Sequence, residues 1–137
     1  MRHERIAVAL SGGVDSSVAC ALLKQEGHEV QAITLRLLPA QVEALLPAEY
    51  EACCREAAIA HAREVSAQLG VPWHLLSAQA VFEKEVLAPF FEGLAAGATP
   101  NPCIACNRAV KFGFLLHRAL QMGAERLATG HYARVEE

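Results

Sequence analysis

The chain lacks the features that would place it in a membrane or outside the cell. It has no run of about 18 apolar residues, the length that a membrane-spanning helix needs. Its first ten residues include Arg2, Glu4 and Arg5, where a secretory signal would have an apolar core. We therefore expect a cytoplasmic protein that makes no contact with a membrane. Its five cysteines are an odd number, which indicates thiols, metal ligands or redox groups rather than a disulfide framework.

Charged residues are too few, and apolar residues too many, for a disordered chain. Charged types make up 20% of the 137 residues and hydrophobic types 53%, a balance that can bury a sizeable core. This length favours one domain, so we expect residues 1–137 to form a single unit.

The net charge of −3 is unevenly distributed along the chain. Residues 40–98 carry three basic and eight acidic side chains, a sum of −5, whereas residues 99–135 carry five basic side chains against Glu125. The five are Arg108, Lys111, Arg118, Arg126 and Arg134. This local charge of +4 could neutralise a few phosphates, and a solvated helix face is the simpler interpretation.

Apolar runs alternate with helical patterns. The runs predict buried parallel strands, and they lie at 5–10, 29–35, 73–77 and 126–129. Helical spacing follows at 16–26, 53–69, 79–96 and 110–122. We expect an irregular or partly helical excursion over 36–51 and a loop over 98–107, which contains Pro100 and Pro102. The alternation predicts an α/β fold with a parallel sheet.

A glycine-containing loop, Ser11-Gly12-Gly13-Val14-Asp15-Ser16-Ser17, joins the first strand to the first helix. The two glycines allow a tight turn that exposes backbone N–H groups, and the helix adds the positive end of its dipole, so the loop suits phosphate. Ser11, Ser16 and Ser17 add hydroxyl donors. Asp15, the only aspartate in the chain, would repel phosphate unless a cation such as Mg²⁺ lay between them. A serine or aspartate N-cap after a glycine turn is the alternative that needs no ligand.

Three further motifs accompany this loop: TPNPCIACN at 99–107, VKFG at 110–113 and ATGHYAR at 128–134. The loop alone resembles the ATP pyrophosphatase superfamily, and all four motifs together resemble the tRNA-specific 2-thiouridylases, the MnmA family. The pair Cys53 and Cys54 also matches a pair common in that family. The resemblance covers residues 5–135. It implies a Rossmann-like, doubly wound parallel sheet of at least four strands with helices on both faces, of the adenine nucleotide alpha hydrolase type.

The resemblance also implies an activity: ATP-dependent 2-thiolation of the wobble uridine of tRNA through an adenylated intermediate. ATP and Mg²⁺ would bind residues 11–17, backbone at Leu35 would contact adenine, and Gly130 and His131 would lie beside the nucleotide. This last position is also the carboxyl edge of the sheet, where ligands bind in open α/β folds. Partners would be tRNA and a sulfur donor such as a cysteine desulfurase or a sulfur relay protein. Arg108, Lys111 and Arg134 are candidates for tRNA phosphates.

Cys103 and Cys106 form a CxxC motif, a spacing that suits a redox dithiol or two ligands of one metal ion or cluster. In the family the position of Cys106 is the catalytic cysteine, and the position of Cys103 is aspartate in many members. The resemblance is to the branch with CxxC, proposed to hold a four-iron four-sulfur cluster with one later cysteine. Cluster ligation, persulfide or disulfide chemistry, and zinc or no role remain alternatives here.

The other cysteines have simpler interpretations. Cys20 lies on the apolar face of the first helix and is expected in the core. Cys53 and Cys54 begin a predicted helix, whose dipole lowers a thiol pKa, and a partly buried pair without chemistry is the simpler interpretation.

The resemblance implies that residues 1–137 are the ATP-binding domain, with the family's tRNA-binding region and C-terminal barrel outside this chain. Two other functions stay open. One is another adenylating ligase or amidotransferase of the same superfamily. The other is a truncated, non-catalytic module that binds a nucleotide or a metal.

Overall fold

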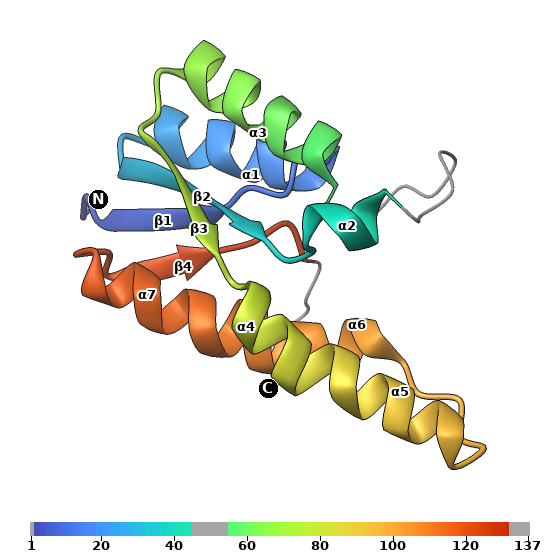
Figure 1. The fold of residues 1–137 in the computed structure, drawn as a ribbon. Helices are drawn as coiled ribbons and strands as arrows, with labels where there is room; N and C mark the ends of the chain where they lie inside the picture. Colours follow the sequence, from blue (N-terminus) through green and yellow to red (C-terminus); the bar gives the residue numbers. More distant parts are fainter. Residues whose placement is uncertain (1, 45–54, 132–137) are drawn as a thin grey trace.

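The sheet has four parallel strands in the order β3-β2-β1-β4, as seen in the computed structural model, which describes residues 2–44 and 55–131 (Figure 1). Its strands are β1 (Arg5–Ala9), β2 (Glu29–Arg36), β3 (Trp73–Ser77) and β4 (Arg126–Ala128). Ile6 of β1 pairs with Val30 on one side and Arg126 on the other. The chain therefore moves outward from β1 to β3 and then returns to the opposite side of β1. This order confirms the doubly wound α/β fold predicted from the sequence.

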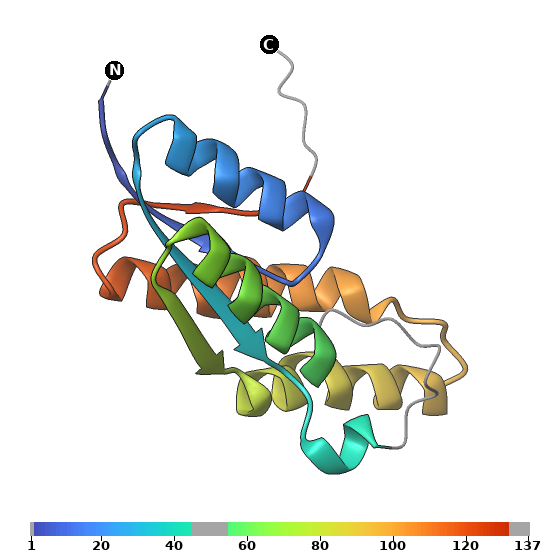
Figure 2. The same ribbon diagram turned by 90° about the horizontal axis from the view of Figure 1, so that it is seen from above.

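Helices cover both faces of the sheet (Figures 1 and 2). One face carries α1 (Val14–Gln25) and α3 (Glu56–Leu69), and the opposite face carries α7 (Leu116–Gln121). Helix α3 ends at Gly70, whose φ of 66° is the left-handed conformation that closes many helices. The short α2 (Ala40–Glu43) follows β2, within the excursion expected over 36–51. Helix α1 begins two residues before the predicted start at 16.

Two long helices built of several parts lie side by side and extend past the sheet (Figures 1 and 2). The first runs through α4 (Gln79–Phe82), the π-helical segment η1 (Glu83–Leu87) and α5 (Ala88–Ala95). The second runs through α6 (Pro102–Ala105), the π-helical segment η2 (Cys106–Leu115) and α7.

The prediction of a loop over 98–107 was wrong beyond Asn101. Pro102 occupies the first helical position, where its fixed φ suits the helix and its missing N–H is not needed. The Asn101 side chain caps the helix by accepting a hydrogen bond from the Cys103 N–H at 3.0 Å. The CxxC motif therefore lies on the first turns of a helix, not in a loop.

Three clusters of buried side chains hold the layers together. Ile6, Val8 and Cys20 belong to the cluster between the sheet and α1 and α3, whereas Ala7 belongs to a cluster with residues of α7. Neighbouring residues of β1 thus face opposite sides, as a strand buried on both faces requires. Cys20 is fully buried, which confirms its expected place in the core, and this burial raises the pKa of its thiol. Among the described residues, no helix is long and apolar enough to cross a membrane.

Candidate functional site

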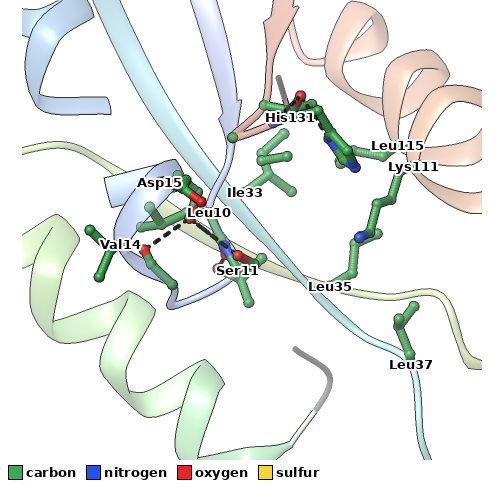
Figure 3. A pocket seen from close by; sticks show the side chains of 16 residues that line it. Leu10, Ser11, Val14, Asp15, Ile33, Leu35, Leu37, Lys111, Leu115 and His131 are labelled. Carbon is green, nitrogen blue, oxygen red and sulfur yellow. Dashed lines mark hydrogen bonds between the residues drawn. The ribbon is translucent and has the colours of Figure 1, made fainter. Parts of the chain in front are cut away.

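A cavity of about 230 Å³ opens at the carboxyl edge of the sheet, beside the ends of β1 and β2 and the segment after β4 (Figure 3). This is the switch point at which doubly wound sheets bind their ligands. Four segments line the cavity: the glycine loop, the end of β2, the η2 helix and the residues after β4. The residues that line the cavity are Ala9, Leu10, Ser11, Gly13, Val14, Asp15, Ser16, Ile33, Thr34, Leu35, Leu37, Lys111, Leu115, Thr129, Gly130 and His131.

Eight of the ten residues predicted to bind the nucleotide line this cavity. They are Ser11, Gly13, Val14, Asp15, Ser16, Leu35, Gly130 and His131. The other two, Gly12 and Ser17, belong to the same loop but do not line it. The fold therefore brings together segments that are more than 100 residues apart in the sequence.

The loop leaves the amino end of α1 without a side-chain cap. Gly13 is the N-cap residue, with extended backbone (φ −84°, ψ 169°), and as a glycine it has no side chain that could accept a hydrogen bond there. The alternative of a serine or aspartate N-cap is therefore wrong. Gly13, Val14, Asp15 and Ser16, at the start of α1, line the cavity, and the free N–H groups and positive dipole end of a helix start bind anions.

Serine hydroxyls brace the loop internally. Ser16 is buried, and its Oγ accepts a hydrogen bond from the Ser11 N–H at 3.2 Å and donates one to the Gly13 carbonyl at 3.3 Å. The Ser17 hydroxyl donates to the same carbonyl at 2.7 Å. Because these two hydroxyls are used within the loop, the backbone N–H groups are the main donors that it offers to a ligand.

Helix α3 supports the loop from behind through His61, which the sequence analysis did not assign to the site. Its Nδ1 donates a hydrogen bond to the Gly12 carbonyl at 2.6 Å. At Gly12, where φ is +86°, an added Cβ would lie 2.4 Å from the Ala58 carbonyl oxygen. His61 and Gly12 are 49 positions apart in the sequence, so no local sequence signal could have revealed the hydrogen bond between them.

The segment after β4 forms the opposite wall. A Cβ at Gly130 would lie 2.7 Å from the Ser16 backbone nitrogen, so only glycine allows this close approach to α1. His131 is exposed at the mouth of the cavity. Its Nδ1 lies 2.9 Å from Thr129 Oγ1 and its Nε2 lies 3.3 Å from Asn107 Oδ1. The His131 ring also contacts that of Phe112 at 5.4 Å between centroids, so it links β4 to η2.

The two CxxC cysteines differ in exposure, and neither lines the cavity. Cys103 is exposed on α6, whereas Cys106 is 8% exposed and packs in a hydrophobic cluster with residues such as Leu37 and Phe82. Within 2–44 and 55–131, no group of three or more His, Cys, Asp or Glu side chains could hold a metal ion. The described residues thus give the iron–sulfur alternative no support beyond the CxxC motif itself. Cys53, Cys54 and Arg134 lie outside the described residues.

Two of the residues predicted to contact tRNA phosphates, Arg108 and Lys111, lie in different surroundings. Arg108 is exposed on η2, as an RNA contact requires. Lys111, on the same segment, is only half-exposed, and its side chain extends into the cavity (Figure 3).

A doubly wound sheet with an uncapped glycine loop at its switch point defines a nucleotide-binding α/β domain. The chain belongs to the family described as the tRNA methyl transferase HUP domain, which matches residues 4–137.

Curated relatives confirm the resemblance to 2-thiouridylases. The chain is 48% identical to the tRNA-specific 2-thiouridylase MnmA of Thermus thermophilus over 137 positions, which cover 97% of the chain and 37% of the relative. It is 46% identical to the protein of the same name from Carboxydothermus hydrogenoformans, over 97% of the chain and 36% of the relative. The chain thus spans little more than a third of the relatives' length.

Solved structures share the fold at low sequence identity. A predicted subunit of tRNA methyltransferase from Methanocaldococcus jannaschii has a TM-score of 0.60 at 21% identity, covering 98% of this chain and 57% of that one. The glutamine-dependent NAD⁺ synthetase of Acinetobacter baumannii has a TM-score of 0.61 at 15% identity, covering 90% and 21%.

Proposed function

We propose that this chain is the ATP-binding part of an enzyme that replaces the C2 oxygen of the wobble uridine of tRNA with sulfur. The cavity carries the proposal, because it gathers the glycine loop, Leu35, Gly130 and His131 at one sheet edge. The relatives that are 46–48% identical bear the 2-thiouridylase name, which favours this function over another ligase, an amidotransferase or a non-catalytic module. Such an enzyme acts where tRNA is found, in the cytoplasm.

The residues of the cavity fit ATP as a substrate. The uncapped first turn of α1 and the exposed backbone of Gly13 suit the pyrophosphate part. Asp15 would hold Mg²⁺ against these phosphates, since the carboxylate alone would repel them. Backbone at Leu35, at the end of β2, would contact adenine. Because Gly130 has no side chain, the segment after β4 lies close to the start of α1, which narrows the space around the nucleotide.

The chemistry has two displacement steps. The uridine C2 oxygen attacks the phosphorus nearest the ribose, the bond from that phosphorus to the bridging oxygen breaks, and pyrophosphate leaves. A sulfur nucleophile then adds to C2, the C2–oxygen bond breaks, and AMP leaves. The loop N–H groups contribute to the first step by stabilising the charge that develops on the departing pyrophosphate.

Sulfur handling belongs to Cys106 with Cys103 as its partner. Of the alternatives for this pair, persulfide or disulfide chemistry needs the fewest further groups, because a cluster requires ligands that the described residues do not supply. Cys106 is buried in a hydrophobic cluster, so its thiol must leave that cluster during the reaction. The sulfur would come from a donor protein such as a cysteine desulfurase or a relay protein, and Arg108 would contact tRNA phosphate.

A chimaera tests this function. The chain replaces the matching segment of the Thermus thermophilus relative, and purified chimaera is incubated with unmodified tRNA, ATP, Mg²⁺ and a sulfur source. We expect 2-thiouridine by mass spectrometry, and its loss in the Cys106→Ser variant with ATP binding retained. Cys20→Ser, at a cysteine that is buried in the core and does not line the cavity, is the matched control. A folded chimaera that binds ATP but makes no thiouridine, or an active Cys106→Ser variant, would contradict the proposal.

A further inference from the structure

Lys111 is the only lysine or arginine among the residues that line the described cavity. It comes from η2, while the glycine loop with Asp15 lies on the other side of the cavity (Figure 3). The surrounding wall at this place is apolar, formed by side chains such as Leu35, Leu37 and Leu115. A single cation thus extends into an otherwise apolar part of the site.

This cation has no carboxylate partner in the part of the chain that the structure describes. The five ion pairs found there all involve other basic residues: Arg2, Arg5, His28, Arg36 and Arg126. A half-buried lysine without a counter-charge gains no ion pair in return for the hydration that its side chain loses. Its position is therefore better explained by an anion that enters the cavity than by the stability of the chain alone.

The direction of the side chain indicates which part of a nucleotide it would meet. Lys111 extends from η2 into the cavity and toward Leu35, at the end of β2, with the glycine loop across the cavity from it (Figure 3). A nucleotide with its terminal phosphates on the loop and its base at the end of β2 must cross the space between them. The phosphoryl group attached to the ribose lies along that path.

We propose that Lys111 binds this ribose-linked phosphoryl group of the nucleotide, and not a phosphate of tRNA. The inference rests on the proposed function, since it needs a nucleotide in the cavity. A lysine suits the role because its ammonium is a compact charge with three donors that a phosphoryl oxygen can accept. Apolar side chains such as Leu35 and Leu37 line this part of the cavity and displace water when a ligand binds, which strengthens the attraction relative to bulk water.

Binding of adenosine, AMP and Mg·ATP to the folded chain tests the assignment. Lys111→Met removes the charged ammonium group but keeps an unbranched, apolar side chain about as long as the lysine stem. Ligand-observed NMR reaches the weak affinities expected for adenosine and AMP. We expect the variant to bind adenosine as the wild type does, and to bind both AMP and Mg·ATP about tenfold or more weakly. Lys84→Met, at an exposed lysine of η1, is the matched control and should bind all three ligands normally.

The series separates the possible failures. A variant that binds all three ligands like the wild type overturns the inference and leaves the proposed function standing. A loss confined to Mg·ATP, with AMP unchanged, also overturns it, because the contact would then be to a terminal phosphate. Loss of adenosine binding as well shows a packing role and rejects a charge-specific one. A folded wild type that binds none of the ligands contradicts the proposed function itself. Lys111→Arg, which keeps the charge, should retain AMP binding more fully than Lys111→Met, and circular dichroism verifies that each variant folds.

Discussion

At the scale of single residues, Gly12 is the position where the glycine loop leaves least room for a side chain. Its φ is +86°, and a Cβ would lie 2.4 Å from the Ala58 carbonyl oxygen on α3. The nearest atom is backbone, so it cannot rotate away as the end of a flexible side chain would.

We expect Gly12→Ala to lower the free energy of unfolding by about 2–4 kcal/mol, from left-handed backbone strain and steric overlap together. It should also weaken Mg·ATP binding, because α3 and the loop must separate. The measurement is urea denaturation followed by circular dichroism.

Gly97→Ala measures the part of this loss of stability that comes from backbone strain alone. Gly97 has a similar φ of +83°, but a Cβ there would have no neighbour within 4 Å among the described atoms. This variant should lose only about 1 kcal/mol, the cost of a positive φ in alanine. Equal losses in the two variants would show that the contact between the loop and α3 is not tight.

At the scale of elements, the short helix α6 directly precedes Cys106, so we expect its opening to expose that cysteine. The helix begins at Pro102, and the Asn101 side chain caps it through the Cys103 N–H at 3.0 Å. Losing such a cap costs about 0.5–2 kcal/mol. This cost lowers the free energy needed to unfold the start of α6 locally. Asn101→Ala should therefore expose Cys106 more often.

Alkylation by iodoacetamide, read by peptide mass spectrometry, measures this opening. We expect Asn101→Ala to raise the rate at Cys106 several-fold, while exposed Cys103 reacts fast in both proteins. Cys20 should stay slow in both, because burial raises the pKa of its thiol and less thiolate is present at neutral pH. Asn101→Asp keeps an acceptor and should behave like the wild type. An unchanged rate at Cys106 in Asn101→Ala would show that α6 does not open on its own.

Strands were the easiest elements to predict. Buried parallel strands carry continuous apolar runs, so the four expected strands end within one residue of those observed. The second long helix was predicted to begin eight residues too late because Pro102 was read as a breaker, although proline at the first helical position favours a helix. Neither the His61 hydrogen bond nor the direction of Lys111 could be predicted, since both depend on how distant elements pack.

At the scale of the whole molecule, the order β3-β2-β1-β4 explains why three of the four segments that line the cavity meet there. Because β2 and β4 flank β1, the loop after β1 lies between the ends of both neighbours. The glycine loop, the end of β2 and the residues after β4 must then meet at one edge. The sequence motifs indicated which residues belong to this edge, and the topology explains why they are together.

The central claim is that this edge binds Mg·ATP, and isothermal titration calorimetry of the folded chain tests it most directly. The titration uses wild type with and without Mg²⁺, Asp15→Asn, and Glu85→Gln, which removes an exposed carboxylate on η1 as a control. We predict that wild type and Glu85→Gln bind Mg·ATP alike, whereas removing Mg²⁺ or the Asp15 carboxylate weakens binding about tenfold or more. Equal affinity in all four titrations would contradict the role of Asp15 and the metal, and no binding by folded wild type would contradict the site itself.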